Sequence, residues 1–115
     1  MTSQMNAVTF DAQHAADLAT FWAAVVGGEV AEGANEQWAQ VHSQRAPMLL
    51  FLQVPEPKTA KNRCHVDLTT DDVEAEVARL VGLGAETVHS KDEWGVRWTT
   101  LRDPQGNEFC VAVHL

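Results

Sequence analysis

Four residues with chemically active side chains occur as two closely spaced pairs in the second half of the chain. His65 and Asp67 form one pair, and Glu108 and Cys110 form the other. Side chains two positions apart point to the same face of a β-strand, so each pair can serve one site. An imidazole near a carboxylate can transfer protons, which makes His65 and Asp67 the candidate catalytic residues. Because residues two apart on a strand do not touch as a rule, this pair needs a third group.

A short basic run precedes the first pair. Lys58, Lys61 and Arg63 are three of the eight basic residues, against sixteen acidic residues and a net charge of -8. We expect this run either to hold an anionic group of a ligand or to be a solvated loop. The overall negative charge repels phosphate backbones and anionic lipids, so neither nucleic acid nor membrane is expected as a partner.

Hydropathy and cysteine usage narrow the class of protein further. No window approaches the roughly 20 apolar residues that span a bilayer, and the polar start from Met1 to Ala7 lacks a secretory signal pattern. We therefore expect a soluble, cytoplasmic protein. Cys64 and Cys110 lack the CxxC spacing of redox and zinc motifs and are expected to be reduced thiols.

A faint internal repeat predicts the elements that position these residues. The order strand, polar turn, helix occupies Ala7 to Val26 and recurs from Cys64 to Leu83. Three candidate strands follow each helix, which predicts βαβββ twice and an α+β fold. The expected helices and later strands are Ala15 to Val26, Glu29 to Ala31, Gln37 to His42, Met48 to Val54, a helix capped by Asp71 or Asp72 and ending at Gly82 or Gly84, Glu86 to His89, Val96 to Arg102 and Glu108 to Val113.

These elements make a single domain over residues 1–115. Module one covers about 5–54, a linker covers 55–62, and module two covers about 63–113. The linker is too short to separate two independent domains. The run from Asp103 to Asn107 is a turn signal that joins the last two strands as a hairpin, because proline fixes φ while glycine and asparagine tolerate a positive φ.

The period of two along the strands predicts which side chains face the helices and which face away. The set expected to pack under the helices is Val8, Phe10, Leu50, Leu52, Val54, Val66, Leu68, Phe109, Val111 and Val113. The opposite face mixes polar, small and aromatic side chains, so we interpret it as the wall of a ligand cavity, with a solvated surface or a dimer interface as the alternatives. The predicted ligand-binding set is Trp38, Phe51, Lys61, Arg63, His65, Asp67, Trp98, Glu108 and Cys110.

Three segments in this order resemble a known group of proteins. They are Asp11 with Leu18 to Trp22 and Gly27, then Lys58 to Leu68, and then Asp103 to Phe109. Together they resemble glyoxalase-like proteins of the vicinal oxygen chelate superfamily, which includes glyoxalase I, extradiol dioxygenases, fosfomycin-resistance enzymes and bleomycin-binding proteins. The resemblance covers nearly the whole chain and implies two βαβββ modules forming a curved mixed sheet.

The resemblance also implies where a metal would lie. In metal-dependent members, His, Gln or Glu ligands come from positions that correspond here to Ala7, a residue near Phe51, His65 and Cys110. Only His65 keeps a usual ligand type, and Cys110 would offer a soft thiolate. We therefore expect no cofactor and a degenerate metal site; a divalent metal, if bound, would take His65, Cys110 and Glu108.

Two functions follow from these observations. The first is a protein that binds a small aromatic, cationic or anionic molecule in its cavity. The alternative is a lyase, isomerase or dioxygenase-type enzyme of the same superfamily that uses His65 with a metal or as an acid or base. The resemblance further implies a homodimer, and a sheet face used mainly as a dimer interface is a third reading. The sequence specifies neither the ligand nor whether a reaction is catalysed.

Overall fold

The computed structural model describes residues 1–113 of the 115-residue chain. The chain forms two compact units, one ending at Pro57 and the other beginning at Lys58. Each unit contains one helix and one four-stranded mixed sheet, so the predicted α+β class and the repeated βαβββ order are confirmed. No helix in the described part of the chain is long and apolar enough to cross a membrane.

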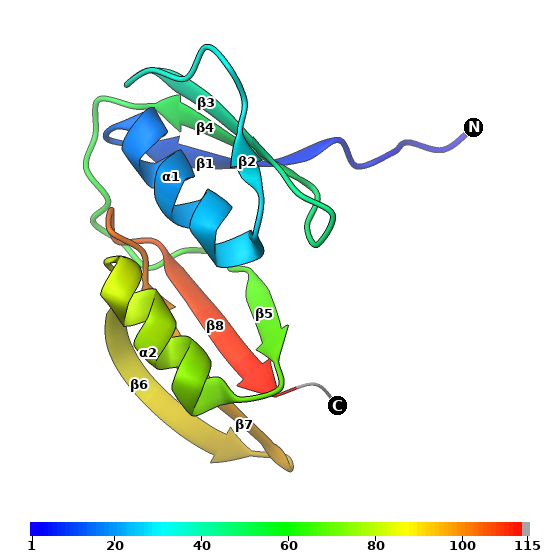
Figure 1. Ribbon diagram of the computed structural model, residues 1–115, viewed down its shortest axis with the longest axis vertical. Coiled ribbons are helices and arrows are strands. Elements are labelled where there is room, and N and C mark those ends of the chain that lie inside the picture. Colours follow the sequence, from blue (N-terminus) through cyan, green and yellow to red (C-terminus); the bar gives the residue numbers. More distant parts are fainter. Residues whose placement is uncertain (114–115) are drawn as a thin grey trace. The chain divides into compact units, whose positions relative to one another are not determined.

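The first unit has its strands in the order β1-β4-β3-β2. Strand β1 runs parallel to β4, whereas β4 with β3 and β3 with β2 are antiparallel. Figure 1 shows helix α1 lying against one face of this sheet. The elements are β1 (Ala7–Ala12), α1 (Ala15–Val26), β2 (Glu29–Val30), β3 (Trp38–His42) and β4 (Met48–Gln53).

Helix α1 has the bounds that its apolar stripe predicts. His14 is the N-cap, and its Nδ1 accepts a hydrogen bond from the backbone N–H of Asp17 at 3.4 Å. Leu18 and Trp22 are fully buried against the sheet side of the helix. Gly27 ends the helix with a φ of 66°, a conformation that costs glycine little because it has no Cβ.

The predicted face assignment for β4 is wrong. Leu49 and Phe51 are 4% and 0% exposed, whereas Leu52 is 38% exposed. Phe51 pairs with Phe10 in the parallel register, and their rings stack with centroids 5.2 Å apart. Phe10 also contacts the ring of Trp22 on α1 at 5.1 Å. Phe51 is therefore core of the first unit, because pairing with β1 fixes a face that the uniformly apolar sequence of β4 leaves open.

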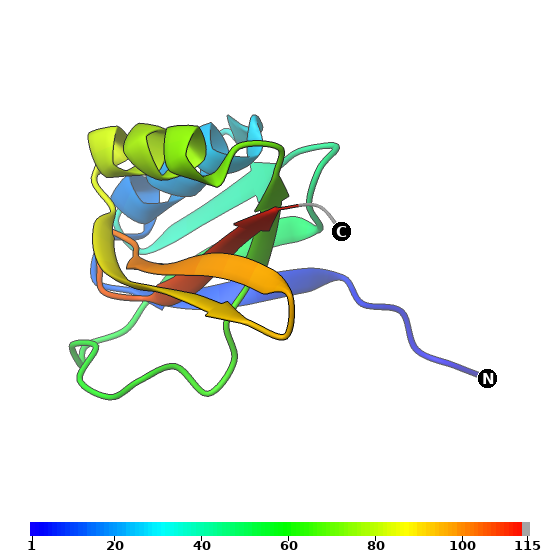
Figure 2. The same cartoon turned by 90° about the horizontal axis from the view of Figure 1, so that it is seen from below.

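The second unit repeats the arrangement with the strand order β5-β8-β7-β6. Strand β5 is parallel to β8, and the other pairs are antiparallel. In Figure 2, helix α2 covers one face of this sheet. The elements are β5 (Asp67–Thr70), α2 (Val73–Leu83), β6 (Glu86–Glu93), β7 (Val96–Arg102) and β8 (Glu108–Val113).

Local sequence explains the ends of α2 and the turn between β7 and β8. Asp72 is the N-cap and accepts a hydrogen bond from the N–H of Ala75 at 3.1 Å, and Gly84 ends the helix. In the predicted turn, Asp103 is 3% exposed and its Oδ1 accepts hydrogen bonds from the backbone N–H groups of Gln105 and Asn107 at 2.9 and 3.0 Å. Both predictions are confirmed.

The hairpin of β6 and β7 extends beyond the predicted strand. Strand β6 continues past His89 to Glu93, with a register irregularity between Thr87 and His89. Trp94 and Gly95 form its tip with φ values of 54° and 74°, the positive values that a type I′ turn requires at both central positions. This left-handed conformation costs a residue with a Cβ about 1–2 kcal/mol, and asparagine is the usual occupant of the Trp94 position.

Candidate functional site

A cavity of about 620 Å³ lies over one face of the sheet in the second unit. Its volume is within the range of about 300–1,000 Å³ that is usual for sites that bind small organic molecules. Strands β5, β6, β7 and β8 and the segment before β5 all contribute to its lining. Six residues of the predicted ligand-binding set line it, namely Lys61, His65, Asp67, Trp98, Glu108 and Cys110.

Alternation along the strands explains why these residues face the cavity. On β8, Cys110 and Ala112 line the cavity, whereas the intervening Val111 is fully buried. On β7, Trp98 lines the cavity, and Thr99 beside it is buried. The period-two interpretation therefore holds around Trp98 on β7 and from Glu108 to Ala112 on β8. It is wrong for Leu68 and Val113, which were predicted to pack under the helix but line the cavity, and Val113 is 42% exposed.

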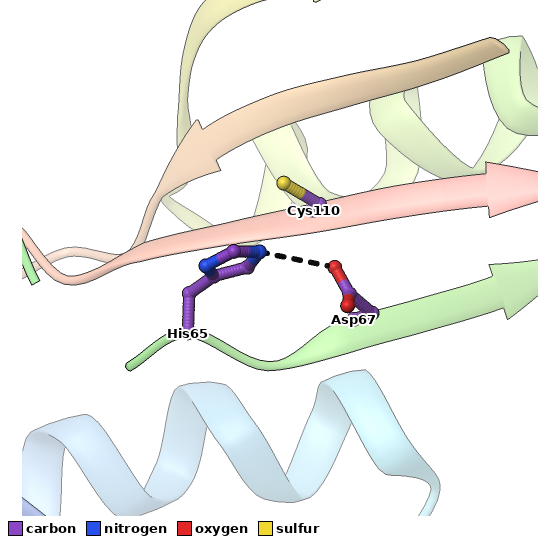
Figure 3. A group of neighbouring side chains, drawn as sticks. All are labelled: His65, Asp67 and Cys110. Carbon is purple, nitrogen blue, oxygen red and sulfur yellow. Dashed lines mark ion pairs between the residues drawn. The ribbon is translucent and has the colours of Figure 1, made fainter. Parts of the chain in front are cut away.

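His65, Asp67 and Cys110 form a compact group on the cavity wall. Figure 3 shows the side chains of His65 and Asp67 facing each other, with Cys110 next to them on the neighbouring strand. One ligand atom from each lies within 4.8 Å of the other two, and His65 Nε2 is 3.3 Å from Asp67 Oδ1. Asp67 and Cys110 are register partners on β5 and β8. His65 reaches Asp67 because it precedes β5 and is not bound by the strand geometry that separates residues two apart.

The thiol of Cys110 has a second polar neighbour in the cavity. Thr100 Oγ1 lies 3.3 Å from Cys110 Sγ, within hydrogen-bond distance for sulfur. Thr100 is the register partner of Cys110 on β7 and also lines the cavity. The thiol is therefore held between a hydroxyl group and the His65–Asp67 pair.

Glu108 does not join this group, in contrast to the predicted alternative ligand set. Its Oε1 accepts a hydrogen bond from Lys58 Nζ at 2.9 Å, and its Oε2 accepts one from the backbone N–H of Asn62 at 3.2 Å. Burial opposes ionisation of the carboxyl, but these hydrogen bonds and the charge of Lys58 outweigh burial and lower the pKa of Glu108. Glu108 therefore anchors the segment that enters the second unit, and Asp67 takes the place proposed for it.

The three residues of the predicted basic run differ in their positions relative to the cavity. Lys58 is paired with Glu108, Lys61 lines the cavity, and Arg63 is exposed and outside the lining. Two further basic residues of the lining, His89 and Lys91 on β6, are absent from the predicted set. The predicted strand ends at His89, before Lys91. In the structure, the register irregularity after Thr87 breaks the alternation that would have indicated His89 and Lys91 as lining residues.

The tryptophans also differ in position. Trp98 lines the cavity of the second unit, and the ring of Trp94 stacks on it with centroids 6.2 Å apart and planes 14° from parallel. Trp38 lies on β3 of the first unit as the register partner of Leu52 and is half-buried. Trp22, as predicted, is core.

The donor set of the His65 group can be tested for its fit to a metal ion. One imidazole nitrogen, one carboxylate oxygen and one thiolate sulfur suit zinc, whose catalytic sites use three protein ligands and leave one position open. The thiolate makes the set a poor match for magnesium, which prefers oxygen ligands. His65 and Asp67 are exposed, so their side chains can adjust to an ion.

Two βαβββ units, one carrying a polar cavity wall on its sheet, define a protein of the vicinal oxygen chelate superfamily. More narrowly, the chain belongs to the glyoxalase-like domain family, whose sequence profile matches residues 7–112. No curated protein matches the chain at a significant level.

Solved structures with low sequence identity share the fold. A glyoxalase/bleomycin resistance protein/dioxygenase family enzyme from Burkholderia phytofirmans PsJN is similar with a TM-score of 0.78 and 14% identity, covering 96% of this chain and 98% of that one. Lactoylglutathione lyase from Agrobacterium tumefaciens is similar with a TM-score of 0.69 and 20% identity, and the match covers 98% of this chain and 95% of that one. TioX from Micromonospora sp. ML1 is similar with a TM-score of 0.68 and 20% identity, and the match covers 98% of this chain and 100% of that one.

Proposed function

We propose that the protein binds a small organic molecule in the cavity of its second unit. The observation that carries the proposal is the cavity itself, which has the volume of a ligand site and combines an aromatic wall with polar groups. A merely solvated sheet face would not need this concentration of His, Asp, Cys and Trp side chains around one hollow.

The lining residues have complementary roles in such binding. Trp98 offers a broad apolar surface for a ring or hydrocarbon portion. His65 and Asp67 can donate to and accept from polar groups of a ligand, and Thr100 can do either. Lys61 can pair with an anionic group. These contacts give both orientation and specificity without requiring a reaction.

Thermal-shift screening against metabolites and aromatic compounds tests this function. A ligand at about 100 times its Kd stabilises the native state by about 2.7 kcal/mol, which for a chain of this size is a Tm rise on the order of 10 °C. His65→Ala should reduce the shift given by any compound found. Arg63→Ala, an exposed neighbour outside the cavity, is the control and should leave it unchanged. An unchanged shift in His65→Ala would contradict the assignment of the cavity.

A second candidate function is catalysis at the group of His65, Asp67 and Cys110. The compact geometry favours it, because three donor atoms converge on one part of the cavity wall. A bound divalent ion would act there as a Lewis acid toward substrate oxygens. Without an ion, Asp67 can orient the imidazole of His65 through Nε2, and the other ring nitrogen, Nδ1, then accepts or donates a proton.

The chain offers a matched pair of cysteines for testing the metal. Protein purified without a metal-binding tag would be titrated with Zn²⁺ and with Co²⁺, whose thiolate charge-transfer absorption reports bonding to sulfur. If the group binds metal, Cys110→Ser should abolish that absorption and Cys64→Ser, at an exposed thiol outside the group, should retain it. Absorption that depends on Cys64, or none with the wild type, would remove the metal-dependent candidate.

Three broader expectations stay proposals beside this one. We propose a single functional domain, a homodimer and a cytoplasmic location, each resting on the sequence or on the family. Sedimentation velocity at several protein concentrations tests the homodimer, and a monomer at every concentration would contradict it.

A further inference from the structure

We propose that Trp94 is a ligand-contacting residue and that the molecule bound in the cavity is an aromatic anion. This inference rests on the proposed binding function and narrows it to a ligand class. It comes from the conformation of the hairpin tip together with the charges that line the cavity.

The position of Trp94 is costly for a tryptophan. The residue has a φ of 54° at the first central position of a tight turn, where a side chain with a Cβ is strained and asparagine is preferred. Its side chain is 88% exposed, so hydrophobic burial within the unit does not explain it. A large aromatic side chain in a strained, exposed position points to a role in contact with something outside the fold.

The stacking of Trp94 connects that position with the cavity. Its ring lies nearly parallel to that of Trp98, which is half-buried and lines the cavity. The two stacked indoles form an aromatic wall that begins at Trp98 in the cavity lining and ends at Trp94 at the tip of the hairpin. Planar aromatic rings gain most from such a wall, because offset stacking adds to the effect of burying apolar surface.

The charges in the cavity indicate the sign of the ligand. Of the two acids of the lining, Glu108 is paired with Lys58, and Asp67 lies 3.3 Å from His65 Nε2, a contact that balances its charge when the imidazole is protonated. Lys61 and Lys91 line the same cavity, and neither makes an ion pair with any residue among 1–113. Lys91 is the register partner of Trp98, so one of these ammonium groups is carried beside the aromatic wall.

A matched pair of probes tests the role of Trp94. Calorimetric titrations would compare 1-naphthoate with its fully saturated analogue, decahydro-1-naphthoate, on the wild type and on Trp94→Asn. Asparagine suits the turn, so this variant keeps the fold while removing the ring. We expect the affinity for 1-naphthoate to fall about three- to tenfold, as the loss of one stacked pair implies, and that for the saturated acid to change less than twofold.

A second comparison tests the charge. Lys91→Gln should lower the affinity for 1-naphthoate and leave the affinity for the neutral 1-naphthalenemethanol unchanged. Arg97→Gln is the control, because it removes the same charge one residue from Trp98, at an exposed side chain that lies outside the lining and approaches Glu74. A preference for 1-naphthylmethylammonium over 1-naphthoate in the wild type would overturn the assignment of an anion.

The outcomes separate this inference from the binding function. Binding of 1-naphthoate that is unchanged in Trp94→Asn, or equal binding of the saturated acid, would overturn the role of Trp94 and leave a ligand cavity in place. If no naphthalene probe binds but another compound stabilises the wild type and loses its effect in His65→Ala, the aromatic class is wrong and the cavity stands. If no compound binds at all, both proposals fail.

Discussion

Glu108 shows how a residue with ligand chemistry can have a mainly structural task. Its two carboxylate oxygens hold Lys58 and the backbone of Asn62, 50 and 46 positions away in the chain. These bonds fix the segment that carries Lys61 at the edge of the cavity. Glu108, which was predicted as a substitute metal ligand, therefore positions the segment from Lys58 to Asn62 that leads into the second unit.

Replacing this carboxylate should make stability less sensitive to acid. Glu108→Gln removes the charge that pairs with Lys58 and should lower the free energy of unfolding by about 1 kcal/mol at pH 7. Because the pKa of Glu108 is lowered from 4.5 in the folded state, its contribution is present above that value and is lost as the pH falls through the lowered pKa. Urea denaturation of both proteins from pH 7 to pH 3 measures the difference.

The difference between the two proteins should therefore shrink below about pH 4.5. Glu32→Gln, which changes an exposed carboxyl in the other unit, is the control and should alter stability little. A difference that is constant or grows on acidification would show that the interaction of Glu108 with Lys58 is not the one described.

At this scale, the candidate site was predictable where alternation is clear. Glu108, Cys110 and Ala112 alternate with the buried Phe109 and Val111 along β8, and His65 and Asp67 flank Val66 where the chain enters β5. Phe51 was misplaced because β4 is apolar on both faces, and only its pairing with Phe10 reveals which face is core. The stacking of Trp94 on Trp98 could not be predicted from local sequence, because the two residues meet across a turn whose geometry is not encoded in hydropathy.

At the scale of elements, the first turn of α2 is capped by one side chain. Asp72 accepts the hydrogen bond of the Ala75 N–H in the first turn. We expect Asp72→Ala to lower the free energy of unfolding by about 1 kcal/mol, and Asp72→Asn, which keeps an oxygen acceptor, to lower it by much less. Chemical denaturation of the two variants measures the free energy of unfolding. Equal losses of stability in both variants would show that the side-chain cap does not stabilise the helix.

The β6–β7 hairpin gives a prediction about strain that is independent of any ligand. Trp94→Asn should change the free energy of unfolding of the free protein by less than about 1 kcal/mol. Asparagine relieves about 1–2 kcal/mol of left-handed strain, but the variant loses the stacking on Trp98, which contributes about 0.5–1.5 kcal/mol. Gly95→Ala should destabilise the protein by about 1 kcal/mol for conformational reasons alone, since an added Cβ would meet no atom within 4 Å. Denaturation curves of both variants test this, and a loss of well over 1 kcal/mol in Trp94→Asn would show that the turn places no strain on Trp94.

Most element bounds followed from local chemistry to within one residue, and the largest exceptions are β5, which begins only at Asp67, and β6. Helix α1 and strands β7 and β8 have the predicted ends, because glycine, the N-cap and the turn after Asp103 mark them. The later part of β6 is a charged run with no strand pattern of its own. It becomes a strand because it pairs with β7, and this long-range effect also brings Lys91 beside Trp98.

At the scale of the whole molecule, the repeated order of elements was the most predictable property. Helical and strand periods repeat along the two halves, and the structure shows one βαβββ unit in each. The two units differ in what their sheets carry. Of the nine predicted ligand-binding residues, Trp38 and Phe51 belong to the first unit, and the cavity-lining residues all come from the second.

The net charge of the chain does not determine the charge of its cavity. The molecule carries -8 overall, yet the lining includes two lysines, Lys61 and Lys91, that form no ion pair within residues 1–113. Exposed acids elsewhere contribute a field that salt screens over about 10 Å at 0.1 M. We therefore expect binding of an anion such as 1-naphthoate to strengthen modestly as ionic strength rises from about 0.01 M toward 0.1 M, because screening weakens the repulsion from the acidic surface. Calorimetry at several salt concentrations measures this, and a steep weakening over that range would contradict it.

The central claim is that the polar face of the second sheet is a binding cavity. An amide-resolved NMR titration with the best compound from the thermal-shift screen tests it most directly. The account predicts that the largest shifts map to residues around His65 and Asp67 and to the cavity-facing parts of β7 and β8. It also predicts that Ala112→Phe, which fills the space beside Trp98 on the same sheet face, abolishes these shifts. Saturable shifts confined to the first unit, or binding that survives in a folded Ala112→Phe variant, would contradict it.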